Sequence, residues 1–191
     1  MKWFPDYNFI LASKSPRRQQ LLRSLDIDFT VQTREVDENY PKYLKKEEVP
    51  VFLAELKARA FQNDLKENDL LITADTIVCL DDQILGKPED YEEAFSMLKT
   101  LSGKKHQVIT GVCLTSLSKQ ISFYSISEVE FKVLTGDEID YYIQHYRPFD
   151  KAGAYGIQEW IGTIGISHIE GSFYNVMGLP VQKLYEMIKI F

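Results

Sequence analysis

Hydrophobic and polar positions along the chain follow two spacings, one typical of buried strands and one typical of helices. Residues 9–12 are a short apolar run, which predicts a buried strand. Leucines then recur at helical spacing over residues 16–25, where Ser15 can cap the helix and Pro16 fits its first position. The pattern predicts a strand, a polar turn and a helix within the first 25 residues.

The same reading predicts the remaining elements. The predicted strands are 29–32, 70–80, a short return strand at 84–85, 106–116 and 121–133. The predicted helices are 51–63, 87–101, 135–145 and 180–190. Thr135 and Glu138 have the spacing of a capping box. Six of the ten glycines lie between Gly153 and Gly178, which predicts loops or strand edges there.

These elements predict an α/β fold. Strands and helices alternate, but the mid-chain hairpins are antiparallel, so the expected sheet is mixed, with helices on both sides. A chain of 191 residues is long enough for one domain with a real core and an internal cleft. We therefore expect one domain over residues 1–191, with two lobes around a central cleft.

Charge limits the ligands that the chain can bind. Its 22 Lys and Arg against 28 Asp and Glu give a formal net charge of −6. A protein that binds duplex nucleic acid by general phosphate neutralisation needs a basic face, so this class is excluded. Any polyanion that this chain binds must meet a local cationic pocket.

The two cysteines, Cys79 and Cys113, each lie in an apolar run and form no C-x-x-C pair. They predict buried free thiols in a reducing compartment. No secretory leader and no run of about 18 apolar residues is visible. We expect a cytoplasmic protein with no membrane partner.

Residues 13–18 gather two hydroxyls and three cations at the start of the first predicted helix: Ser13, Lys14, Ser15, Arg17 and Arg18. Free backbone N–H groups and the helix dipole favour an anion there. Two arginines in a first helical turn are unfavourable, because their positive charge faces the positive end of the helix dipole. A bound anion would offset this repulsion. A solvated basic turn explains the same pattern, and spacing alone leaves both interpretations open.

Asp75 interrupts the most apolar run of the chain. A carboxylate at the end of a buried strand needs a cation, a metal or several donors, and ligands of α/β proteins bind at such strand ends. The alternative is an aspartate that caps a tight bend. Glu35, Asp37 and Glu38 could join Asp75 in holding Mg²⁺ or Mn²⁺. From the sequence alone, a hydrophilic loop explains those three residues better.

Three further polar residues are candidates whose individual signals are weak. Lys57 and Lys87 are each typical surface lysines, but together with the two arginines they could supply the local positive charge. Gln158 ends a stretch of small residues, where an amide can offer the paired donor and acceptor that read a base edge.

The three histidines, His106, His145 and His168, lack metal-ligand spacing and are interpreted as structural or surface residues. No P-loop and no G-x-S-x-G elbow occurs.

Five segments in this order resemble the Maf-like nucleoside triphosphate pyrophosphatases: residues 11–18, 74–76, 86–88, 101–103 and 150–158. The resemblance runs from about Phe9 to Tyr185. It implies an ITPase-like α/β fold, a divalent metal such as Mg²⁺ or Mn²⁺, and hydrolysis of a nucleoside triphosphate to its monophosphate and pyrophosphate. The run Asp-Lys-Ala-Gly-Ala-Tyr-Gly-Ile-Gln at 150–158 resembles the branch that acts on dTTP and UTP.

The resemblance also implies roles for single residues. Asp75 would be the proton acceptor, and Arg17, Thr76 and Gln158 would govern substrate choice. The positions that would line the phosphate and metal site are Ser13, Ser15, Arg18, Lys57, Lys87 and, for the metal, Glu38 with Asp75. Two departures from the family pattern are Lys14, where a small residue is usual, and the segment Glu159-Trp160-Ile161-Gly162, which replaces a glycine after Gln158.

The expected reaction is metal-assisted attack of water on the α-phosphorus. The expected biological role is house-cleaning, in which the enzyme keeps non-standard nucleotides out of nucleic acids. The resemblance also suggests a homodimer. A nucleotide-binding regulator of cell division without turnover is the alternative, which the acidic residues disfavour because a sensor needs no base. A phosphomonoesterase of the Asp-x-Asp type lacks its second aspartate here.

Overall fold

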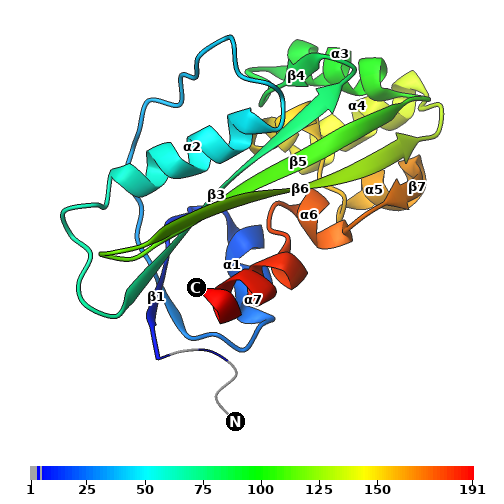
Figure 1. Cartoon of the computed structure of the whole chain (residues 1–191). Helices are drawn as coiled ribbons and strands as arrows, with labels where there is room; N and C mark the ends of the chain where they lie inside the picture. The colour runs from blue at the N-terminus through cyan, green and yellow to red at the C-terminus, as the bar shows by residue number, and fades with distance from the viewer. Residues whose placement is uncertain (1–3, 5) are drawn as a thin grey trace. The chain divides into compact units, whose positions relative to one another are not determined.

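The computed structural model describes residue 4 and residues 6–191 and contains a seven-stranded sheet in the order β2-β1-β3-β5-β6-β7, with β4 paired to β3 (Figure 1). The strands are β1 Asn8–Leu11, β2 Phe29–Val31, β3 Asp69–Leu80, β4 Gln83–Leu85, β5 Lys105–Thr115, β6 Gln120–Phe131 and β7 Ile166–Glu170. β1 is parallel to β2 and β3, whereas β4 and β7 are antiparallel to β3 and β6. The predicted mixed sheet is confirmed.

Seven α-helices and two 3-10 turns accompany the strands in the described part of the chain. The helices are α1 Pro16–Arg23, α2 Glu48–Arg59, α3 Tyr91–Leu101, α4 Gly136–Tyr146, α5 Trp160–Gly165, α6 Phe173–Met177 and α7 Val181–Ile190. The 3-10 turns are η1 Pro148–Asp150 and η2 Ala152–Ala154. The α/β class predicted from the sequence is therefore confirmed.

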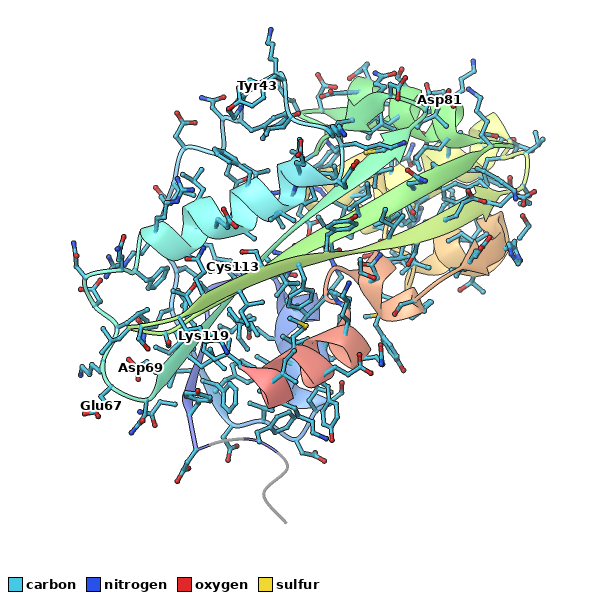
Figure 2. All side chains as sticks on the ribbon, in the orientation of Figure 1. Tyr43, Glu67, Asp69, Asp81, Cys113 and Lys119 are labelled. Carbon is cyan, nitrogen blue, oxygen red and sulfur yellow. The ribbon has the colours of Figure 1, made fainter. Side chains whose placement is uncertain are left out.

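The chain divides into two compact units. Unit 1 comprises Met1–Asp75, Thr110–Ser125 and Gly178–Phe191. Within it α2 lies on one face of the sheet, and α1 and α7 lie on the other (Figure 1). Ala54 and Ala58 of α2 pack on a buried apolar cluster that includes Cys113 of β5 (Figure 2). Small residues on α2 let the helix lie close to the sheet.

Unit 2 comprises Thr76–Ile109 and Ile126–Met177. Its core joins apolar side chains of β3, β5 and β6 to one face each of α3 and α4. The fully buried members of that core include Leu98, Leu101, Phe131, Ile139 and Tyr142. The buried residues of α3 and α4 therefore face the sheet within this unit.

Local capping signals predicted the helix starts well. Ser15 Oγ accepts a hydrogen bond from the Arg18 N–H at 3.4 Å, and both bonds of the Thr135–Glu138 capping box are present. The predicted start of α3 at Pro88 is wrong, because Asp90 caps this helix by accepting from the Glu93 N–H at 2.9 Å. The chain from Gly86 to Asp90 is a connection, not a helix.

Two other boundaries differ from the predictions. α2 begins at Glu48, with Pro50 in its first turn, where the missing N–H costs no helical bond. The glycine-rich region was predicted to hold loops or strand edges. It holds an edge strand, β7, as expected, and also two short helices, α5 and α6, which were not predicted. These elements are five or six residues long, too short for a periodic signal, and each is completed by contacts with distant segments.

Both cysteines are buried and free, as predicted. Among the helices of residues 4 and 6–191, none combines the length and apolar character that a membrane span requires.

Candidate active site

The residues predicted to form the site fall into two groups, one in each unit. Unit 1 holds Ser13, Ser15, Arg17, Arg18, Glu38, Lys57 and Asp75, and unit 2 holds Thr76, Lys87 and Gln158. Asp75 and Thr76 are consecutive residues of β3.

Asp75, Lys57 and Glu38 come together in unit 1 around one ammonium group. Lys57 Nζ donates to Asp75 Oδ1 at 2.5 Å and lies 3.0 Å from Glu38 Oε1. The side chains of Lys57 and Asp75 are 17% and 13% exposed, whereas that of Glu38 is 46% exposed. A charge buried as deeply as Asp75 needs a compensating partner, and Lys57 provides it.

The packing of α2 explains how these groups meet. β3 carries a buried carboxylate at its first residue, Asp69, and a second, Asp75, in the middle of its apolar run. Lys57 is near the C-terminal end of α2. Its neighbour Ala58 packs on the sheet, which brings the lysine within reach of β3. The sequence left a cation, a metal or several donors open as the partner of Asp75, and the structure shows a cation, Lys57. The expected position at a strand end is wrong, because β3 continues from Asp75 to Leu80, and the alternative of a bend capped by this aspartate is wrong for the same reason.

The other two acidic residues predicted near Asp75 lie elsewhere. Glu35 pairs with Lys14 at 3.5 Å on the surface, and Asp37 accepts from the N–H and the amide of Asn39. Of the three candidates in this loop, Glu38 is the one that reaches the Lys57–Asp75 pair. In residues 4 and 6–191, no three His, Cys, Asp or Glu side chains form a ready metal-binding group.

The start of α1 is organised by two serine hydroxyls. The Ser15 N–H donates to Ser13 Oγ at 3.2 Å, and Ser15 Oγ accepts the Arg18 N–H. Each hydroxyl oxygen is thus an acceptor for the backbone, which leaves its own proton to be donated to another group. The predicted N-terminal geometry, with Pro16 as the first helical residue, is confirmed.

The Arg18 guanidinium forms hydrogen bonds with two backbone carbonyls. Its Nε donates to the Gly178 carbonyl and its Nη1 to the Ala74 carbonyl, both at 2.8 Å. Burial lowers the pKa of its guanidinium, and the negative charge of Asp75 opposes that effect. Arg18 therefore braces the backbone immediately before Asp75, a role that the sequence pattern did not indicate.

In unit 2, Lys87 and Gln158 are exposed on neighbouring segments, while Thr76 is half-buried. The Gly153 N–H donates to the Gly86 carbonyl at 2.9 Å, which ties the segment carrying Lys87 to the 150–158 loop. This backbone hydrogen bond joins two of the three unit 2 segments that carry predicted site residues. Lys87 itself lies in a connection and does not start a helix.

Sequence reasoning missed a buried ionic group beside Gln158. Lys151 Nζ lies 2.6 Å from Asp150 Oδ1 and 3.2 Å from Glu159 Oε1, and its side chain is buried. Glu159 also accepts the hydroxyl proton of Tyr142. The available signal was the presence of opposite charges, Lys151 and Glu159, at the two ends of a stretch of small and apolar residues. Their neighbour Tyr142 lies on α4 and is identified only by the tertiary structure.

Comparisons with known proteins agree with this arrangement of motifs. A family model described as "Maf-like protein" matches residues 8–191. A protein of Bacteroides thetaiotaomicron named dTTP/UTP pyrophosphatase is 55% identical over 184 residues, which cover 96% of this chain and 95% of that protein. A protein of the same name from Porphyromonas gingivalis is 53% identical over 188 residues, with 97% and 94% covered.

Two solved structures resemble part of the chain more remotely. The Staphylococcus aureus Ham1 protein has a TM-score of 0.45 at 15% identity and covers 65% of this chain and 71% of its own. A nucleoside-triphosphatase, dITP/XTP pyrophosphatase, from Mycobacterium abscessus has a TM-score of 0.42 at 12% identity, with 65% and 74% covered.

Proposed function

This chain belongs to the Maf-like protein family, and we propose that it is a nucleoside triphosphate pyrophosphatase that hydrolyses dTTP and UTP to the monophosphate and pyrophosphate. One observation carries the proposal: a buried carboxylate, Asp75, is held by Lys57 beside Glu38 in a chain that is more than half identical to proteins named for this reaction. A protein that only sensed nucleotides would not need this carboxylate.

Asp75 acts as the base of the proposed reaction. It accepts a proton from a water molecule whose oxygen attacks the α-phosphorus, and the bond between that phosphorus and the bridging oxygen breaks as pyrophosphate leaves. Lys57 holds the Asp75 carboxylate through the 2.5 Å bond, and Arg18 holds the backbone one residue earlier. The position of the base is therefore determined by α2 and by α1.

The carboxylates of Asp75 and Glu38 fit a hard divalent cation, Mg²⁺ or Mn²⁺, which prefers oxygen ligands. They supply two ligands, and water and phosphate oxygens would complete the set. When bound, such a cation would acidify the attacking water and screen the phosphate charges. The greater exposure of Glu38 allows it to turn toward a cation without breaking the Lys57–Asp75 bond.

The proposed phosphate ligands are Ser13, Ser15, Arg17, Arg18, Lys57 and Lys87. Hydroxyl protons at the start of α1 and charged side chains would donate to the phosphate oxygens and stabilise the charge on the leaving pyrophosphate. They supply the local positive charge that a chain with a net charge of −6 needs for a polyanionic substrate.

Thr76, Gln158 and Arg17 are proposed to select the substrate. The Gln158 side chain offers a donor and an acceptor together, which suits the edge of uracil or thymine. A site built to form hydrogen bonds with one edge rejects other bases, because its polar groups are then left unpaired.

The biological setting is part of the same proposal. We infer a house-cleaning role toward non-standard pyrimidine nucleotides, a homodimeric assembly, and no nucleic-acid or membrane partner. Two free buried thiols support a reducing compartment such as the cytoplasm. One family match extends through both units, which supports treating residues 1–191 as a single Maf-like domain.

A panel of nucleoside triphosphates tests the proposal. The purified chain is incubated with dTTP, UTP, CTP, dGTP and ATP in Mg²⁺ or Mn²⁺, and pyrophosphate, orthophosphate and nucleoside monophosphate are measured. We expect pyrophosphate and monophosphate in equal amounts, fastest from dTTP and UTP. Orthophosphate release would identify a different reaction class, and no turnover of either pyrimidine triphosphate would refute the proposal.

Asp75→Asn tests the catalytic base. An amide cannot accept the proton, so kcat should fall at least about 100-fold while nucleotide binding changes little. Asp82→Asn is the matched control, since Asp82 is exposed in the turn after β3. A near-normal kcat for Asp75→Asn would remove Asp75 from the mechanism.

A further inference from the structure

Gln158 lies in a tight turn whose two ends are held by one hydroxyl group. The Glu159 N–H donates to the Gly156 carbonyl at 3.0 Å, which closes the turn around Ile157 and Gln158. The Gly156 N–H donates to the Tyr142 hydroxyl oxygen at 3.0 Å, and that hydroxyl donates its proton to Glu159. Tyr142 therefore bonds to the first and the last residue of the turn.

This arrangement is rigid because its polar groups are buried and paired. Tyr142 is fully buried, and its ring belongs to the core of unit 2. Burial, together with the hydrogen bond to Glu159, raises the pKa of the Tyr142 hydroxyl well above its usual range, so the proton remains available for donation. Lys151 pairs with the other oxygen of Glu159 at 3.2 Å. Fully satisfied buried networks of this kind specify one geometry.

The ends of the Glu159 and Gln158 side chains lie close to the backbone of Gly156, the first residue of the turn. A Cβ on Gly156 would lie 2.8 Å from Glu159 Cδ and 3.0 Å from Gln158 Nε2. The glutamate carboxylate and the glutamine amide are thus both packed against the Gly156 backbone. The Gln158 amide therefore lies beside Gly156, the residue whose N–H is bonded to Tyr142.

We propose that Tyr142 and Glu159 are positioning residues that set base selectivity by holding the Gln158 turn in one conformation. The inference rests on the proposed function, since it concerns how Gln158 reads the base. It extends that function by assigning a role to a tyrosine on α4 and to the acidic residue that stands in place of the glycine usual after this glutamine. Neither side chain is placed in the chemical step.

A mutant cycle on selectivity tests the proposal. The ratio of kcat/KM for UTP to that for CTP is measured for the wild type, Tyr142→Phe, Gln158→Ala and the double variant, because these two nucleotides differ at the base edge. Tyr142→Phe keeps the buried ring and removes the hydroxyl. Tyr142→Phe should lower the UTP/CTP ratio of kcat/KM roughly five- to tenfold, as expected for one net hydrogen bond. In the double variant, Tyr142→Phe should change this ratio little beyond the effect of Gln158→Ala.

Tyr146→Phe is the matched control. Tyr146 is on the same helix, one turn further on, and its ring stacks on Tyr142 with centroids 5.2 Å apart, but its side chain is partly exposed. This variant should keep the wild-type ratio. Glu159→Gln provides a second variant if Tyr142→Phe folds poorly, and it should lower the ratio in the same direction.

Amide hydrogen exchange separates this inference from the proposed function. In Tyr142→Phe the Gly156 amide loses its acceptor, so its exchange should be faster by roughly tenfold, while the Ile139 amide, bonded to the Thr135 carbonyl within α4, should be unchanged. Unchanged Gly156 exchange would overturn the proposal even if the enzyme is active. The proposal would also be overturned if Tyr142→Phe lowered the UTP/CTP ratio equally in the wild type and in Gln158→Ala. Absence of turnover in the wild type would instead refute the proposed function.

Discussion

His106 on β5 should make the protein less stable as the pH falls from 7 to 5. The ring is 2% exposed and stacks on Phe131, and its Nε2 lies 2.7 Å from the Tyr155 hydroxyl oxygen. Its Nδ1 is buried with no hydrogen-bond partner among the described residues. Protonation would therefore bury a charge in the unit 2 core, and this desolvation lowers the pKa of His106 to about 4.

The magnitude follows from the difference between this pKa and the ordinary histidine value of about 6.5. Above pH 6.5 both the folded and the unfolded ring are neutral, so His106 causes no pH dependence. Between pH 6.5 and 4 the unfolded ring binds a proton that the folded ring does not, so stability falls. At pH 5 the loss relative to pH 7 is about 2 kcal/mol, and it levels off at roughly 3 kcal/mol below pH 4.

Urea unfolding at pH 7 and pH 5 measures this loss. His106→Gln has a neutral side chain at both values, so the wild type should lose about 2 kcal/mol more than this variant between them. His145→Gln removes an exposed histidine from α4 and serves as the control, because it should keep the wild-type pH dependence. Equal losses for the wild type and His106→Gln would show that His106 is not buried in its neutral form.

Two further variants test unit 1. Lys57→Met should destabilise the fold by about 3 kcal/mol, because it removes the ammonium group that is hydrogen-bonded to the buried Asp75 carboxylate. A thermal melt with the activity assay checks this, and an unchanged melting temperature would contradict the assigned pairing. Ser15→Ala should lower the free energy of unfolding by about 1 kcal/mol, because it removes the N-cap of α1. Chemical denaturation measures this change. Wild-type stability in the variant would show that the 3.4 Å hydrogen bond between the Arg18 N–H and Ser15 Oγ contributes nothing.

Much of the fold could be predicted from the sequence because the signals are local. An apolar run followed by Ser15 and Pro16 describes β1 and the start of α1, and the Thr135–Glu138 spacing describes the start of α4. Such signals depend on side chains that bond with backbone three residues away. The start of α3 was placed too early because Pro88 was preferred over Asp90, the residue whose carboxylate caps the helix.

The predicted site residues were recognisable as types, but their contacts were not. Sequence analysis indicated that Asp75 needs a counter-charge, since a carboxylate in an apolar strand is costly. The residue pattern did not identify Lys57 as that partner. The family resemblance, and not the spacing of the acidic residues, singled out Glu38 from Glu35 and Asp37. Lys57 is 18 residues from Asp75, and the two meet because α2 packs on β3 through small side chains.

By itself, the sequence determined the α/β class, most strands and helices, the helix caps and the family motifs, because each depends on residues close together along the chain. Only the tertiary structure decided that Arg18 bonds with the carbonyls of Ala74 and Gly178, and that Tyr142 holds the turn around Gln158. Those bonds join elements far apart in the sequence. They form where packing brings buried polar groups within 3 Å, because such groups are stable only when paired.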